Sequence, residues 1–224
     1  LAGFPEEAGG TFVQGGTVGN LSALSAGRER ARHEGATPQR WAIAATDAAH
    51  SSVAAAARTL DCDVILVEGD DRGRMTGSGL ERALAANEHA GVFAVVATAG
   101  TTNAGIIDDL TGVADVCAER RLWMHVDGAY GLAGMAAPSI RSRYNGIERA
   151  DSFIVDPHKW LFAPYDCCAL VYRHPAWGAL AHSQHASYLD HLDRTEWNPA
   201  DYAIQLTRRA RGLPFWFSLA TYGT

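Results

Sequence analysis

The chain is poor in lysine. Its 224 residues include nineteen lysines and arginines, and Lys159 is the single lysine among them. Arginine replaces lysine well as a solvated charge, but it keeps its proton and cannot attack a carbonyl. Nucleophilic amines that form Schiff bases are therefore a chemistry that lysine supplies. Lys159 is a candidate catalytic residue, and the alternative is chance survival in an arginine-biased composition.

Long apolar runs are also missing. No run approaches the ~20 apolar residues that span a bilayer, so we expect no membrane contact. The first seven residues have neither the charged start nor the apolar stretch of a signal peptide. The chain begins with Leu1 rather than methionine, so we expect it to be an excised piece of a longer protein.

Patterned cysteines and an excess of positive charge are absent as well. The four cysteines show no metal or disulfide spacing, which favours a reduced, cytoplasmic setting. A net charge of −6 without a basic cluster argues against nucleic-acid binding. Several His and Asp residues imitate a metal cluster, but their irregular spacing predicts no metal site; they are His182, His185, Asp190 and His191.

What the sequence does contain is an alternation of short apolar runs and helical patterns. This alternation, with runs that are apolar on both faces, predicts an α/β fold with a mostly parallel sheet buried beneath flanking helices. The predicted strands are Trp41–Ala45, Asp63–Val67, Val92–Thr98, Leu122–Asp127, Ser152–Val155 and Cys168–Tyr172. The predicted helices are Val18–Arg32, Ser51–Leu60, Gly79–Ala90 and Ile107–Arg120. Arg173–Trp197 has weak periodicity and is predicted to be a long loop.

Reactive side chains follow several of the predicted strands. One strand ends in Asp127, the next leads into Asp156-Pro-His-Lys159, and Asp47 and His50 follow an earlier one. Because ligands of open α/β sheets gather beyond the carboxyl ends of the strands, we expect these groups at one edge. A buried acid needs a cation or donors, and the protonated pyridine nitrogen of pyridoxal phosphate (PLP) is such a partner. The alternative for Asp127 is a helix or turn cap.

A phosphate would need its own donors. Gln14-Gly-Gly-Thr17 precedes a predicted helix, so it offers close backbone approach, free N–H groups and a hydroxyl. The alternative is that this turn only caps the helix.

Taken together, five segments resemble the PLP-dependent group II amino-acid decarboxylases, the family of aromatic-L-amino-acid, histidine and glutamate decarboxylases. The resemblance runs from about Gly9 to the end of the chain and implies PLP fold type I, the aspartate-aminotransferase-like large domain. The segments are Gly15-Gly-Thr17 with Asn20-Leu, Asp47-Ala-Ala-His50-Ser-Ser, Thr98-Ala-Gly-Thr-Thr102, His125-Val-Asp-Gly-Ala-Tyr130 and Asp156-Pro-His-Lys-Trp160.

The resemblance implies a role for each matching residue. It implies that Lys159 forms the Schiff base with PLP, that Asp127 pairs with the pyridine nitrogen and that His50 stacks on the ring. Tyr188 matches the tyrosine that protonates the substrate carbon after CO₂ leaves. The remaining cofactor-binding residues are implied to be Gly16, Thr17, Thr102, Ala129, Asp156 and His158. Asp156 stands where aromatic-acid members often have asparagine. The alternatives are a helix cap for His50, a core histidine for His158 and a packing aromatic for Tyr188.

The resemblance also implies decarboxylation of an L-amino acid, with aromatic substrates favoured, by a homodimer whose active site lies at the interface. We expect residues 1–180 to form the PLP-binding domain, and residues 181–224 to hold a catalytic loop and the connection to a small domain. Another PLP enzyme of the same fold (aminotransferase, aldolase or sulfur-lyase) and a non-catalytic interaction domain are the alternatives.

Overall fold

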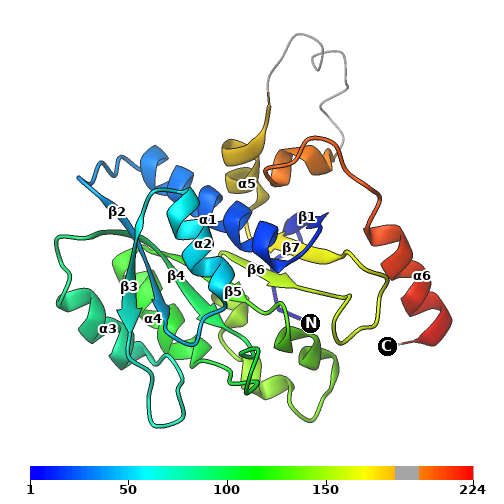
Figure 1. Ribbon diagram of the computed structural model, residues 1–224, viewed down its shortest axis with the longest axis horizontal. Coiled ribbons are helices and arrows are strands. Elements are labelled where there is room, and N and C mark those ends of the chain that lie inside the picture. Colours follow the sequence, from blue (N-terminus) through cyan, green and yellow to red (C-terminus); the bar gives the residue numbers. More distant parts are fainter. Residues whose placement is uncertain (185–196, 224) are drawn as a thin grey trace.

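The structure, a computed structural model, describes residues 1–184 and 197–223. A central sheet with the strand order β1-β7-β6-β5-β4-β2-β3 runs through this part of the chain (Figure 1). Neighbouring strands from β3 to β6 pair in parallel, while β7 is antiparallel to both β6 and β1. The strands are β1 Gly9–Val13, β2 Trp41–Thr46, β3 Asp63–Val67, β4 Gly91–Thr98, β5 Trp123–Asp127, β6 Ser152–Val155 and β7 Cys168–Tyr172. The predicted mostly parallel sheet is confirmed.

Helices connect the strands, and local signals explain where several of them begin. Thr76 and Asp109 each accept a backbone N–H with their side chains at helix starts, as N-cap residues do. The α-helices are α1 Gly16–His33, α2 Ser51–Thr59, α3 Gly77–Ala85, α4 Leu110–Arg120, α5 Pro175–His182 and α6 Gly212–Tyr222. Four short 3₁₀ helices are η1 Gly131–Ala136, η2 Arg141–Tyr144, η3 Ile147–Arg149 and η4 Pro199–Tyr202.

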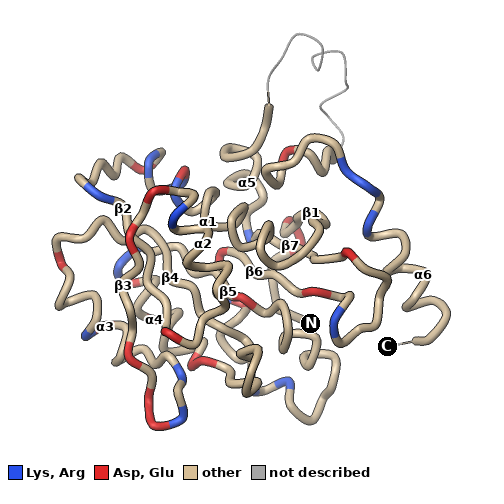
Figure 2. Tube along the Cα trace, viewed as in Figure 1, with Lys and Arg blue, Asp and Glu red and all other residues tan. Residues whose placement is uncertain are grey.

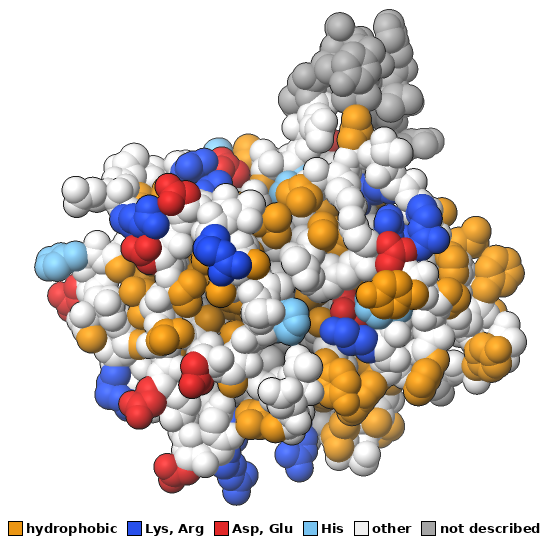
Figure 3. All heavy atoms as spheres, in the orientation of Figure 1, with side chains coloured by type: hydrophobic (Ala, Val, Ile, Leu, Met, Phe, Trp, Pro, Cys, Tyr) orange, Lys and Arg blue, Asp and Glu red, His pale blue; other side chains and the backbone are white. Residues whose placement is uncertain are grey.

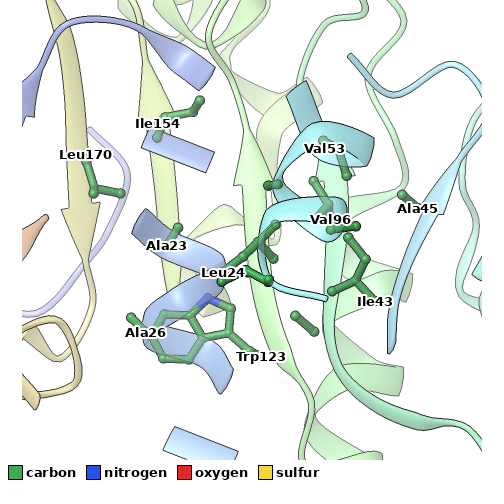
Figure 4. Close-up of a cluster of buried hydrophobic side chains, with 14 of the residues drawn as sticks. Ala23, Leu24, Ala26, Ile43, Ala45, Val53, Val96, Trp123, Ile154 and Leu170 are labelled. Carbon is green, nitrogen blue, oxygen red and sulfur yellow. The ribbon is translucent and has the colours of Figure 1, made fainter. Parts of the chain in front are cut away.

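The sheet has a hydrophobic core on each face. Ala94 and Val96 of β4 pack into the core beneath α1 and α2, whereas Val95 and Ala97 pack beneath α3 and α4. Figure 4 shows the first core, where the indole of Trp123 lies beside residues of α1. Because successive strand residues point to opposite faces, a continuous apolar run satisfies both cores, as we predicted for strands covered by helices.

Several features differ from the predictions, among them helix α6, which was not predicted. Strand β1, which pairs with β7 at one edge, was not predicted, because its residues, Gly-Gly-Thr-Phe-Val, begin with two poor strand formers. The predicted loop Arg173–Trp197 is wrong in its first part, where α5 begins with Pro175 at a position that favours proline. Strand β3 is not buried on both faces, since it is the edge strand and Leu66 is exposed.

Charged residues of both signs are intermixed along the chain, with a basic run between η4 and α6 (Figure 2). These arginines form hydrogen bonds or ion pairs: Arg208 donates to Thr11 and to the Phe12 carbonyl, and Arg211 pairs with Asp166.

Helix α6 has no buried residue, and hydrophobic side chains gather at its edge of the molecule (Figure 3). No helix in the described residues is long and apolar enough to cross a membrane.

Candidate active site

A pocket of about 200 Å³ lies at the carboxyl ends of β4, β5 and β6, where the N-termini of α1 and α2 meet this edge of the sheet. In open α/β sheets this edge is where ligands bind. Nine of the ten predicted site residues line this one pocket: Gly16, Thr17, His50, Thr102, Asp127, Ala129, Asp156, His158 and Lys159. Tyr188, the tenth, lies outside the described residues.

Asp127 is the last residue of β5 and is 5% exposed. Its Oδ1 accepts the backbone N–H of Ala129 at 3.1 Å, and its Oδ2 accepts the side-chain amide of Asn20 at 2.8 Å. The predicted alternative, a turn cap, is therefore correct for Oδ1 of Asp127, which caps the turn at Ala129. Two donors hold the carboxylate in place, and it still borders the pocket.

Lys159 follows β6 by one turn and is held beside a buried acid. Its Nζ lies 3.0 Å from Asp156 Oδ2, and the Nε2 of His158 lies 3.6 Å from the same oxygen. Asp156 is 2% exposed, and its Oδ1 is buried without a partner among the described residues. His158 accepts the Cys167 backbone N–H through Nδ1, so its ring is anchored on one side. This arrangement places an amine, an acid and an imidazole together in the pocket.

The start of α1 forms a second side of the pocket. Gly15 is the N-cap residue and has no side chain to cap the helix, while its carbonyl accepts the N–H groups of Val18 and Gly19. The N–H groups of Gly16 and Thr17 therefore have no partner within the described residues. A Cβ at Gly16 would lie 3.1 Å from Ala129 Cβ, so only glycine leaves this space open. Free N–H groups at a helix start suit an anion.

His50 is the N-cap residue of α2, so the predicted helix-cap alternative is correct for one ring nitrogen. Its Nδ1 accepts the Ser52 backbone N–H at 3.2 Å and lies 2.8 Å from Ser52 Oγ. The residue itself is exposed and borders the pocket. The cap therefore anchors one edge of the imidazole and leaves Nε2 free for another contact.

The structure adds lining residues that the sequence analysis did not assign: Asn20, Ser52, Thr98, Gly100, Thr101, Tyr130 and Tyr165. Thr98 ends β4 directly beside Asp127, and its hydroxyl is buried without a partner in the described part of the chain. Helical spacing was a usable signal for Asn20, because residues three and four apart share one face of a helix. That rule places Asn20 beside Gly16 and Thr17.

His125, two residues before Asp127, is fully buried beneath the pocket. Its burial lowers its pKa from 6.5 to about 4, and the nearby Asp127 carboxylate opposes this shift. Below about pH 6.5 His125 therefore binds a proton in the unfolded chain, whereas its imidazole stays neutral in the folded protein until about pH 4. The contribution of His125 to the free energy of unfolding should consequently fall by about 3 kcal/mol as the pH drops from 6.5 to 4.

We expect urea unfolding of the full-length protein and of His125→Gln to reveal this dependence. The stability gap between the two proteins should be largest above pH 6.5 and should shrink as the pH approaches 4. Exposed His89 supplies the matched control, because His89→Gln makes the same substitution outside the buried core. A His125→Gln gap that stays constant from pH 7 to pH 4.5 would contradict the prediction.

Comparison with known proteins gives relatives for the whole chain. It is 32% identical to the aromatic-L-amino-acid decarboxylase of Bacillus atrophaeus over 231 residues, covering 100% of this chain and 48% of the relative. It is 35% identical to the acidic amino acid decarboxylase GADL1 of Xenopus tropicalis, covering 98% and 46% of the two chains. The crystal structure of Oryza sativa TDC with PLP and tryptamine matches with a TM-score of 0.90 and 31% identity, over 97% of this chain and 47% of that one.

The chain thus spans about half the length of the curated relatives it matches. The model of the pyridoxal-dependent decarboxylase conserved domain matches residues 1–224. This match covers the whole sequence, and the residues that line the pocket at the carboxyl edge of the sheet lie within it. The chain therefore belongs to the pyridoxal-dependent decarboxylase family, whose cofactor is PLP.

Proposed function

We propose that the protein containing this chain decarboxylates an L-amino acid to its amine with PLP as cofactor, and that the substrate is aromatic. The convergence of nine predicted site residues on one pocket carries the proposal. Family membership supports the reaction type. The similarity to an aromatic-L-amino-acid decarboxylase and to a structure with bound tryptamine supports the aromatic substrate.

The pocket has groups that match each end of PLP. The open N–H groups of Gly16 and Thr17 suit its phosphate, and the Asp127 carboxylate suits its protonated pyridine nitrogen. Two buried oxygens without partners in the described residues, Thr98 Oγ1 and Asp156 Oδ1, also border this space. A bound group with donors would satisfy them, as buried polar atoms require. When bound, PLP supplies an aldehyde that condenses with amines and a ring that withdraws electrons.

In this proposal, Lys159 is the nucleophilic amine. Its ion pair with Asp156 at 3.0 Å holds Nζ at the edge of the pocket, and the same carboxylate can accept the proton that Nζ must lose before it attacks. Asp127 keeps a negative charge at the far end of the ring. Two N–H groups donate to it and hold both of its oxygens in place.

His50 is proposed to lie against the ring face, because its cap anchors Nδ1 and leaves the rest of the imidazole at the pocket. Thr102 and Ala129 also line the pocket and are proposed to contact the ring or its substituents. His158 is proposed to bind the phosphate, and Asp156 to contact the cofactor. Tyr188 remains the proposed proton donor to the substrate carbon.

The proposed assembly is a cytoplasmic homodimer with its active site near the subunit interface. Its support is the resemblance of the sequence motifs and the open side of the pocket, where Thr102 and His50 are exposed. We keep residues 1–180 as the proposed cofactor domain and residues 181–224 as the proposed catalytic loop and connection.

An assay of the full-length protein with PLP and each of the twenty amino acids tests this function. We expect CO₂ and the corresponding amine from an aromatic amino acid, with acidic amino acids turned over more slowly. Fastest turnover of an acidic amino acid would keep the decarboxylase and overturn the aromatic substrate. Keto-acid or aldehyde products without CO₂ would instead assign another PLP reaction, and PLP binding without turnover would assign a non-catalytic domain.

A further inference from the structure

A row of buried side chains joined by hydrogen bonds runs beneath the pocket. It starts at Trp123, whose Nε1 donates to Ser152 Oγ at 3.0 Å. Ser152 Oγ also lies 2.8 Å from Nδ1 of His125. All three residues are at most 1% exposed, so water does not compete for these bonds.

Asn20 of α1 joins this row to the pocket. Its Oδ1 lies 2.8 Å from Nε2 of His125. Its Nδ2 donates to Asp127 Oδ2 at 2.8 Å and to Ser52 Oγ at 2.9 Å. Both hydrogens of the amide are thereby used, one toward the acid and one toward the hydroxyl that contacts His50.

The chemistry of the partners leaves one arrangement of protons. A carboxylate only accepts hydrogen bonds, so the Asn20 amide nitrogen must face Asp127 and its oxygen must face His125. His125 then carries its proton on Nε2, which donates to Asn20. Its bare Nδ1 accepts from the Ser152 hydroxyl, and that oxygen in turn accepts from the indole of Trp123, which can only donate.

Ser52 and His50 form the other branch of the row. Ser52 Oγ accepts one hydrogen of the Asn20 amide, so its own hydrogen points to Nδ1 of His50. That nitrogen also accepts the Ser52 backbone N–H, and it must therefore lack a proton. The proton of neutral His50 is then on Nε2, the nitrogen that is free to face the pocket.

We propose that Asn20 is a positioning residue that sets two active-site groups at once: it fixes the orientation of the Asp127 carboxylate and, through Ser52, it holds His50 as the tautomer protonated on Nε2. The proposal rests on the proposed function for the use made of these groups. It does not require a particular substrate. Burying a polar side chain is costly unless it is hydrogen-bonded; Asn20 is 1% exposed and makes three such bonds.

The tautomer can be measured without cofactor. We expect the ¹⁵N resonances of the His50 ring in the cofactor-free, full-length protein to report a protonated Nε2 and a bare Nδ1, with the signal assigned by its loss in His50→Gln. In Ser52→Ala the hydroxyl bond to Nδ1 is lost and only the backbone N–H bond remains, so the ¹⁵N shift of Nδ1 should move. Ser52→Thr keeps a hydroxyl and should restore the wild-type shifts.

Asn20→Asp tests the other branch. The variant keeps the shape but places a second carboxyl against Asp127, so the two must share a proton. We expect the dissociation constant for PLP, measured by equilibrium dialysis, to rise about 10- to 100-fold, the range for losing a hydrogen bond to a charged group. Ser22→Ala is the matched control, because Ser22 is a fully buried hydroxyl on the same helix that does not line the pocket.

Unchanged His50 shifts in Ser52→Ala, or unchanged PLP affinity in folded Asn20→Asp, would overturn the proposal. A loss of PLP affinity in Ser22→Ala as large as that in Asn20→Asp would also overturn it, by showing that any buried polar change on α1 has this effect. Since the tautomer is read without cofactor or substrate, a protein that binds PLP but releases no CO₂ fails the proposed function and leaves this test intact.

Discussion

Lys159→Arg is expected to abolish covalent attachment of PLP. Arginine stays protonated at all accessible pH values and cannot form the bond to the aldehyde. The variant should still fold, because a guanidinium can keep the ion pair that Lys159 makes with Asp156 at 3.0 Å. Decarboxylation should fall to background together with the covalent adduct.

Borohydride reduction followed by peptide mass spectrometry measures this directly. Reduction makes the adduct permanent, and Lys159 is the single lysine of this sequence, so any modified lysine peptide from this segment identifies the site. Arg141→Lys is a matched control, since it adds a lysine elsewhere in the segment and should leave the adduct on Lys159. An adduct of equal yield in Lys159→Arg would assign the reactive amine to another part of the protein.

Asp127→Asn is expected to weaken PLP binding and turnover by about 10²- to 10³-fold. Both carboxylate oxygens accept N–H groups, from Ala129 and from Asn20. The new amide nitrogen must therefore face a donor, and the pyridine nitrogen loses its counter-charge. Removing one partner of a buried charged pair costs about 3–5 kcal/mol, which corresponds to about 10²- to 10⁴-fold and therefore includes the expected loss.

Equilibrium dialysis with PLP and the rate of amine formation check this expectation. Asp109→Asn is the matched control: Asp109 caps α4 with its side chain, and asparagine caps a helix about as well as aspartate. The control should bind PLP and turn over substrate like the wild type. If Asp127→Asn behaved like this control, Asp127 would not be the partner of the cofactor ring.

Much of the fold was predictable because its signals are local. The strands β2 to β7 were each recognised from short apolar runs, and four helices were recognised from their periodicity and their end signals. Strand β1 was not, because its identity depends on pairing with β7 rather than on its own residues. Helix α5 was hidden in a segment rich in His and Asp, where periodicity is weak.

The place of a site residue was predictable where that residue lies at the end of a strand or in the first turn of a helix. Asp127 ends one buried strand, Asp156 directly follows another, and Gly16 and Thr17 begin α1, so their place at one sheet edge follows from the topology. Other features of the site depend on contacts that chain order does not give. Thr98 was within the predicted strand, but its orphaned hydroxyl depends on the neighbouring strand and on the space around it.

The amino-acid sequence by itself determined the parallel sheet and the sheet edge at which the candidate residues Lys159 and Asp127 lie, because the periodicity of each strand and the order of the strands and helices can be read directly from the chain. Only the tertiary structure decided that Asn20 would connect Asp127 to His50. That connection requires α1 to lie close to β6, where a Cβ at Gly19 would come within 2.7 Å of Ile154 Cγ2. The hydrogen bonds of Asn20 then join residues 32 and 107 positions away in the sequence, and bonds of that span form only when helix and sheet pack together.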